Sequence, residues 1–107
     1  MFPNWERLQQ WRWAVRIISR KRLREFAERH PDAKRPLDDW YNVVRRVEWE
    51  SPHDVKATFG NASIVGDVVV FNIAGNKYRL STNIRYRYRV VYIRSVMTHE
   101  EYDEAAL

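Results

Sequence analysis

Four side chains in the last third of the sequence have types and spacings suited to chemistry on a phosphodiester. They are Lys77 and Arg79, which one residue separates, and His99 and Tyr102, which two residues separate. Cleavage of RNA without a metal requires a base for the 2′-hydroxyl proton, cations for the charge on the phosphorane, and an acid or cation at the departing 5′-oxygen. These four residues are therefore candidate catalytic groups for cutting RNA.

The two C-terminal candidates are expected on a short helix. Thr98 and Glu101 spell a capping box, which places His99 in the first turn. A helix N-terminus disfavours a protonated imidazole and keeps His99 available as a base; the alternative is an ordinary exposed residue in a capped turn. Tyr102 follows on the same side of the helix. It could stack on a base, donate a proton or anchor the helix on the sheet.

The two cations are expected on a β-hairpin over residues 68–87. Gly75-Asn76 suits a two-residue turn, and closure there sets Asn72 opposite Arg79. Alternation along the second strand then gives one apolar and one cationic face, which suggests a polyanionic partner; the alternative is a solvated strand face. The cationic face would hold Lys77, Arg79, Ser81, Asn83, Arg85 and Arg87. The core face would hold Tyr78, Leu80, Thr82, Ile84 and Tyr86.

Further polar side chains are weaker candidates for contacts with RNA, because most exposed polar groups only interact with water. The formal net charge of +5, with arginine the dominant cation, favours nucleic acid or an acidic protein as the partner. The candidate RNA-binding residues are Arg22, Lys56, Asn72, Arg85 and Arg94.

Composition excludes several other classes of site. The chain has no cysteine, which rules out disulfides and thiolate metal sites and fits a reducing cytoplasm. Its three histidines lack a metal-ligand spacing, and its three glycines do not form a phosphate-binding loop. No apolar run approaches membrane-spanning length. We therefore expect neither a metal nor a cofactor, and no membrane partner.

The first half of the chain is expected to supply an appendage, a strand and two helices. Residues 1–14 are tryptophan-rich and differ in composition from the single domain expected over 15–107. Residues 15–18 are expected to form a buried strand, Ser19 to cap a helix ending near His30, and Pro36 to open a second helix. The core-facing stripe of that second helix would be Leu37, Trp40, Tyr41 and Val44.

The second half reads mainly as strands. Residues 55–59 are expected to be extended, followed by strands over 67–74, 77–86 and 89–96 and the short helix after Thr98. This order predicts an α+β fold. It has a short N-terminal strand, two helices packed on a mainly antiparallel sheet with a three-strand meander, and a short C-terminal helix.

Two stretches resemble the HigB toxins of bacterial type II toxin–antitoxin systems. Residues 70–80 read VFNIAGNKYRL and residues 92–103 read YIRSVMTHEEYD. Residues 16–19, the helix over 37–47 and residues 56–59 are also similar to that family. The resemblance runs from about Ala14 to the C-terminus, so residues 1–14 lie outside it.

This resemblance implies a RelE-like fold and an mRNA interferase, a small cytoplasmic ribonuclease that inhibits translation by cutting mRNA, often in the ribosomal A site. It also implies a HigA-type helix-turn-helix antitoxin, with DNA bound only through that antitoxin. By position, Arg79 would stabilise the phosphate with Lys77 beside it. His99 and Tyr102 fall where such enzymes place acid–base or stacking residues, and which is base and which is acid stays open.

Two other readings compete with the enzyme. One is a non-catalytic RNA-binding module, and the other is an inactive relative that acts only through an antitoxin complex. A binding module should present aromatic side chains on its basic face, whereas Tyr78 and Tyr86 are expected on the core side. The four candidate catalytic residues together favour the enzyme.

Overall fold

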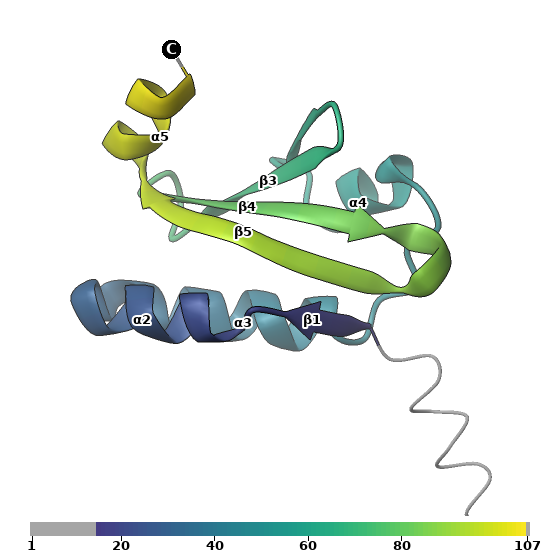
Figure 1. Cartoon of the computed structure of the whole chain (residues 1–107), viewed down its shortest axis with the longest axis horizontal. Coiled ribbons are helices and arrows are strands. Elements are labelled where there is room, and N and C mark those ends of the chain that lie inside the picture. Colours follow the sequence, from purple (N-terminus) through teal and green to yellow (C-terminus); the bar gives the residue numbers. More distant parts are fainter. Residues whose placement is uncertain (1–14, 107) are drawn as a thin grey trace, which may run out of the picture.

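Residues 15–106 are described in the computed structural model of this chain, and over that range they form an α+β fold built on one sheet (Figure 1). The expected appendage at 1–14 lies outside the described residues. The strands of the described part are β1 (Arg16–Ile18), β2 (Ser63–Val65), β3 (Val68–Ile73), β4 (Tyr78–Arg85) and β5 (Val90–Thr98). Their order is β1-β5-β4-β3-β2, with β1 parallel to β5 and the other pairs antiparallel. The predicted fold class is confirmed.

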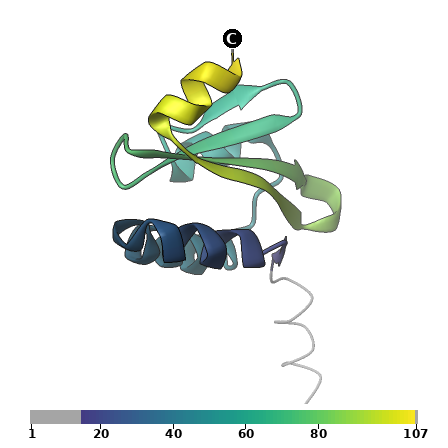
Figure 2. The same cartoon turned by 60° about the vertical axis from the view of Figure 1, so that its left-hand side comes forward.

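The helices lie on both sides of this sheet (Figures 1 and 2). They are α2 (Lys21–Arg29), α3 (Lys34–Val44), α4 (Pro52–Thr58) and α5 (His99–Ala106), with 3-10 turns η1 (Pro31–Ala33) and η2 (Tyr86–Tyr88). The pair α2 and α3 covers one face, and α5 rises from the end of β5 on the other side. We call the face away from α2 and α3 the open face. No helix among residues 15–106 is long and apolar enough to cross a membrane.

The core lies between the α2–α3 pair and the sheet. Apolar residues of the helices face this layer at helical spacing, and alternate residues of the strands meet them. The predicted stripe of α3 is confirmed at three positions, while Tyr41 is only half-buried. The buried residues of these elements include Leu23, Phe26, Leu37, Trp40, Val44, Val69, Phe71, Ile73, Tyr78, Leu80, Val91 and Ile93.

The hairpin has the predicted register, with Phe71 opposite Leu80 and Asn72 opposite Arg79. Its turn spans residues 74–77, and Gly75 adopts a φ of +69° that a glycine reaches without the steric cost of a side chain. The predicted cationic face is wrong at both ends. Lys77 belongs to the turn, and Arg87 lies in η2, because β4 already ends at Arg85.

A bulge interrupts the pairing of β4 with β5. Ser81 pairs with Ser95, while Thr82 pairs with Ile93, so Arg94 is the extra residue on β5. A bulge changes which side chains reach a given face along the strand that carries it. Here Arg94 donates a 2.8 Å hydrogen bond from Nη1 to the Oδ1 atom of Asn83.

Three local predictions are wrong. Residues 55–59 are not extended: Pro52 begins α4, where its missing N–H costs nothing, and Asp54 accepts a hydrogen bond from the Glu50 amide. Ser19 does not cap α2, since its φ is +71° and the N-cap is Arg20. The strand β1 is an edge strand with an exposed Arg16 rather than a buried strand.

One helix boundary and one additional strand also differ from the prediction. The helix α3 begins at Lys34, before the expected Pro36, because the 3-10 turn over residues 31–33 leads directly into it. The strand β2 was not predicted. It pairs with β3 at the far edge of the sheet, and its three residues are exposed, so no buried pattern marks it in the sequence.

Candidate active site

The start of α5 is fixed against the hairpin turn. The backbone amide of His99 donates a 2.8 Å hydrogen bond to the carbonyl oxygen of Lys77. The predicted capping box is confirmed: the Glu101 amide donates to Thr98 Oγ1 at 3.1 Å, and the Thr98 amide donates to Glu101 Oε1 at 2.9 Å. These bonds lower the pKa of the Glu101 carboxyl. The imidazole of His99 is thereby held beside the turn that carries Lys77.

A hollow of about 480 Å³ lies at this junction, and we call it the tip hollow. His30, at the C-terminal end of α2, lines it together with His99. The His30 ring stacks on Phe26 with a centroid distance of 4.4 Å and lies 5.4 Å from the ring of Tyr78. The other lining residues are Asn76, Lys77, Tyr78, Thr98 and Glu100.

Asp32 connects the hairpin turn to the helix layer. Its carboxylate accepts a 2.7 Å hydrogen bond from Lys77 Nζ and a short one from the Tyr78 hydroxyl. These bonds lower the pKa of Asp32 and raise the pKa values of Lys77 and Tyr78. The Lys77 ammonium therefore points toward η1, not along the strand face beside Arg79. Sequence reasoning missed Asp32, which lies 45 residues before Lys77.

Arg79 lies on the other side of the turn, between Asn72 of β3 and Met97 of β5. Its Nη1 atom donates to the carbonyl oxygens of Asn76 at 2.9 Å and Tyr78 at 3.3 Å. Within residues 15–106 its Nε and Nη2 atoms make no hydrogen bond. The half-buried guanidinium is thus fixed by the turn and keeps donors that suit phosphate oxygens.

A carboxylate one helical turn away lies beside the imidazole of His99. Asp103 Oδ2 lies 2.8 Å from the buried Nδ1 atom of the imidazole. A neutral imidazole that carries its proton on Nδ1 presents the lone pair of Nε2 to a substrate. Sequence reasoning missed Asp103, although its spacing of four residues from His99 on a helix is a usable signal.

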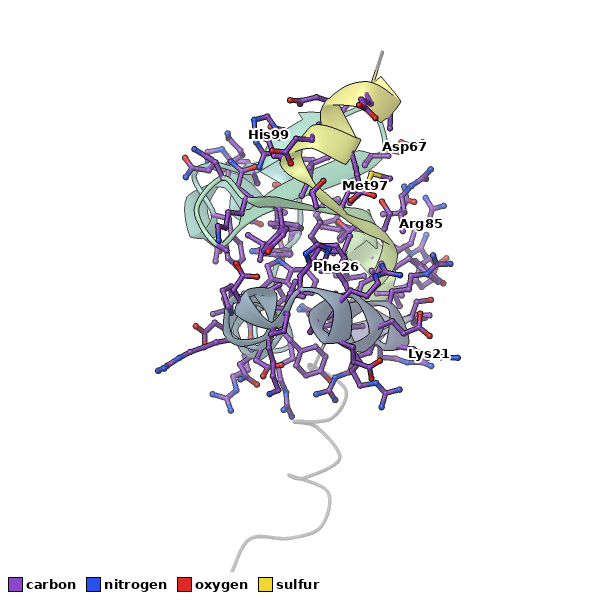
Figure 3. The ribbon with its side chains drawn as sticks, turned by 90° about the vertical axis from the view of Figure 1, so that its left-hand side faces the viewer. Lys21, Phe26, Asp67, Arg85, Met97 and His99 are labelled. Atoms are coloured by element: carbon purple, nitrogen blue, oxygen red, sulfur yellow. The ribbon has the colours of Figure 1, made fainter. Side chains whose placement is uncertain are left out.

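Tyr102 faces a different hollow from His99. This second hollow, about 360 Å³, lies on the open face, and we call it the sheet hollow. Figure 3 shows His99 and Met97, another residue of the sheet hollow, on opposite sides of the junction between β5 and α5. The other lining residues are Val65, Val68, Val70, Ser81, Arg94, Ser95 and Ala105.

The structure therefore does not bring the four candidate catalytic residues into one hollow. Lys77 and His99 line the tip hollow, whereas Tyr102 lines the sheet hollow and Arg79 is bound to the turn between them. Both hollows border the end of β5, where Met97 lines the sheet hollow and Thr98 lines the tip hollow, and only the tip hollow includes residues of the turn over 74–77. An extended RNA that crosses the end of β5 would contact both hollows.

The candidate RNA-binding residues are spread over the surface. Lys56 donates to the carbonyl oxygens of Gly60 and Ala62, which gives it a structural partner on α4. Asn72 donates to Asn76 Oδ1 at 3.4 Å, beside the turn. Arg94 lines the sheet hollow and Arg85 is exposed at the end of β4, whereas Arg22 lies in the helix layer.

A metal site is not apparent in the described residues. Among residues 15–106, no three His, Asp or Glu side chains come close enough together to hold a metal ion. The side chains of this site can perform two kinds of chemistry. His99 can transfer a proton, and Arg79 and Lys77 can stabilise negative charge.

The chain was also compared with models of known protein families. Residues 33–105 match the family model described as HigB_toxin, the RelE-like toxic component of a toxin–antitoxin system. The chain belongs to the HigB toxin family. The matched range includes α3, the hairpin and most of α5, and it contains Arg79 and His99. Membership of this HigB family implies an antitoxin partner.

Individual HigB relatives match over most of the chain. The chain is 33% identical over 92 residues to the mRNA interferase toxin HigB of Escherichia coli K12, covering 83% of this chain and 88% of that protein. The mRNA interferase HigB of Shigella flexneri gives the same identity and coverage. The mRNA interferase HigB of Escherichia coli O6:H1 is 23% identical, covering 84% of this chain and 90% of the relative.

Proposed function

We propose that this HigB-family toxin is a metal-independent endoribonuclease that cleaves mRNA and so inhibits translation. The observation that carries the proposal is the junction of the hairpin turn with α5. It holds Lys77, Arg79 and His99 around one short segment through the 2.8 Å backbone hydrogen bond between His99 and Lys77. The relatives named as mRNA interferases support the substrate class.

In this mechanism, each side chain has a separate task. The Nε2 atom of His99 takes the proton from the ribose 2′-hydroxyl, which then attacks the adjacent phosphorus. The guanidinium of Arg79 and the ammonium of Lys77 stabilise the charge that grows on the phosphorane oxygens. Asp103 and Asp32 keep the imidazole and the ammonium in place. Tyr102 receives a neighbouring base in the sheet hollow.

The partners follow from the same proposal. The mRNA would be cut on the ribosome in the cytoplasm, with the open face and its Asn72, Arg85 and Arg94 toward the RNA. A HigA-type helix-turn-helix antitoxin would hold the toxin inactive, and DNA would be bound only through that antitoxin. Lys56 and Arg22 are the weaker RNA contacts, because Lys56 already binds two carbonyl oxygens and Arg22 lies in the helix layer.

The test is expression of the chain without an antitoxin, with growth and cleavage of translated mRNA measured together. Arg79→Ala should relieve growth arrest and reduce cleavage about 100-fold, because it removes the guanidinium at the turn. Arg79→Lys should recover only part of the activity, since it keeps the charge without the forked donors. Arg46→Ala, which removes an exposed arginine after α3, is the matched control. A wild-type chain that neither arrests growth nor cuts mRNA would contradict the proposed function.

A further inference from the structure

A second imidazole stands in the tip hollow, and the mechanism above does not use it. His30 caps the C-terminal end of α2 and lines the same hollow as His99. Its ring is half-buried and is held by stacking on Phe26 and by the ring of Tyr78. Such a ring costs little further entropy to hold in place during a reaction.

The two imidazoles stand at opposite ends of their helices. His30 lies at the carbonyl end of α2, where a positive charge is stabilised. His99 is the first residue of α5, at the amide end, and Asp103 Oδ2 lies 2.8 Å from its Nδ1 atom. The two imidazoles therefore reach the tip hollow from different elements, His30 from the end of α2 and His99 from the start of α5.

From this geometry we infer that His30 is the general acid that completes the cleavage reaction, with His99 as the general base across the tip hollow. The inference rests on the proposed ribonuclease function and assigns a proton donor that the four candidate residues did not include. The hollow of about 480 Å³ that both residues line has room for a phosphodiester linkage.

The proton balance closes with these two groups. His99 takes one proton from the 2′-hydroxyl, and the 2′-oxygen forms a bond to phosphorus. The bond from phosphorus to the 5′-oxygen breaks, and protonated His30 gives one proton to that oxygen. The products are a 2′,3′-cyclic phosphate and a 5′-hydroxyl, and water resets the two imidazoles by exchanging one proton with each.

Several charged groups face His30 from the elements around it. Glu101 of α5 is close enough that His30 contributes to lowering the pKa of that carboxyl. Asp32 is neutralised by Lys77, so it adds little net charge near the ring. The other titratable groups around the ring are Arg29 of α2, Tyr78 of β4, and His99 and Glu100 of α5.

The experiment compares His30→Phe with His99→Gln and with the control His53→Gln, which changes the exposed histidine on α4. Phenylalanine keeps a ring against Phe26 and Tyr78 and removes both nitrogens, so thermal unfolding should be little changed. Cleavage of a defined mRNA, free and bound to ribosomes, should fall about 100-fold for His30→Phe. His30→Phe should also lose the descending limb of the wild-type pH–rate profile, as expected when a general acid is removed.

A substrate with sulfur in place of the bridging 5′-oxygen distinguishes an acid from a structural residue. A thiolate leaves without a proton, so His30→Phe should cut this substrate at nearly the wild-type rate, whereas His99→Gln should not. Wild-type rates for His30→Phe on the oxygen substrate, or an equal defect on both substrates, would overturn the assignment while the proposed function stands. A wild-type chain inactive on every RNA would instead refute the function itself.

Discussion

The backbone amide of His99 donates a hydrogen bond to the carbonyl oxygen of Lys77 at 2.8 Å, and this bond joins the first residue of α5 to the hairpin turn. The same turn is tied to the helix layer through the contact between Lys77 and Asp32. The candidate base and one candidate cation are therefore positioned by main-chain and short side-chain contacts on both sides of a single turn. Loss of either attachment should lower the rate of catalysis more than it disturbs the packing of the core.

Thr98→Ala tests the attachment of α5. It removes the Oγ1 acceptor of the capping box, so the free energy of unfolding should fall by about 1 kcal/mol, as for other lost N-caps. The rate of mRNA cleavage should fall as well, because His99 directly follows the cap. Thr98→Ser, which keeps the hydroxyl, is the control. Unchanged stability in chemical denaturation of Thr98→Ala would show that the box does not hold the helix.

Asp32→Asn tests the attachment on the other side of the turn. The pKa of Asp32 is lowered below its ordinary 3.8, so its contribution to stability is present above pH 3.8 and is lost as the pH falls further. The pKa values of Lys77 and Tyr78 are raised above 10.5 and 10.0, so their contribution is present below these values and is lost at higher pH.

The expected result for Asp32→Asn is a lower Tm than the wild type at pH 7 and a smaller difference at pH 3. Asp38→Asn is the matched control, because Asp38 forms an exposed ion pair with Lys34 one helical turn away, and such pairs contribute little. If the two variants have the same Tm at pH 7, the contacts of Asp32 stabilise the fold no more than an ordinary exposed ion pair does.

Local signals account for the parts of the fold that the sequence predicted correctly. The Gly75-Asn76 turn determines the hairpin register, the spacing of Thr98 and Glu101 determines the start of α5, and the apolar stripe over Leu37, Trp40 and Val44 identifies the buried face of α3. Each of these depends on residues within about one or two turns of one another.

The rest depended on contacts that no local pattern encodes. The direction of Lys77 is determined by Asp32, which is distant in sequence, because a turn residue does not follow strand alternation. The bulge at Arg94 leaves no mark in the alternation of β5. His30 reads as the last residue of a helix and becomes part of the site only because α2 ends beside β4 and α5.

Asp103→Asn tests the orientation of the base. Asparagine keeps the size of the side chain but no longer presents a carboxylate to Nδ1 of His99, which lies 2.8 Å away. Cleavage should fall about tenfold, less than the loss of about 100-fold expected for His99→Gln, because the imidazole itself remains. Glu104→Gln, an exposed acid on the same helix, controls for the change in charge. An equal loss from both acidic variants would mean that the charge of α5, not the orientation of His99, matters.

Tyr102 has three possible roles that one set of variants can separate. In the sheet hollow it contacts the same space as Met97 and Ser81, so we expect it to stack on a base of the RNA. Tyr102→Phe keeps the ring and should retain nearly the wild-type KM and kcat. Tyr102→Ala should weaken binding of a short mRNA by about 1–3 kcal/mol, the usual value for one stacked base, which raises KM at least fivefold.

The other two roles give different patterns in the same measurements. If the phenol donated a proton, Tyr102→Phe would lower kcat as much as Tyr102→Ala, because both lack the hydroxyl. If Tyr102 only anchored α5 on the sheet, Tyr102→Ala would lower the Tm. KM would then change only under conditions in which part of the variant is unfolded. We expect neither, since the half-buried ring lines an open hollow and α5 is already held by its capping box and by the bond between His99 and Lys77.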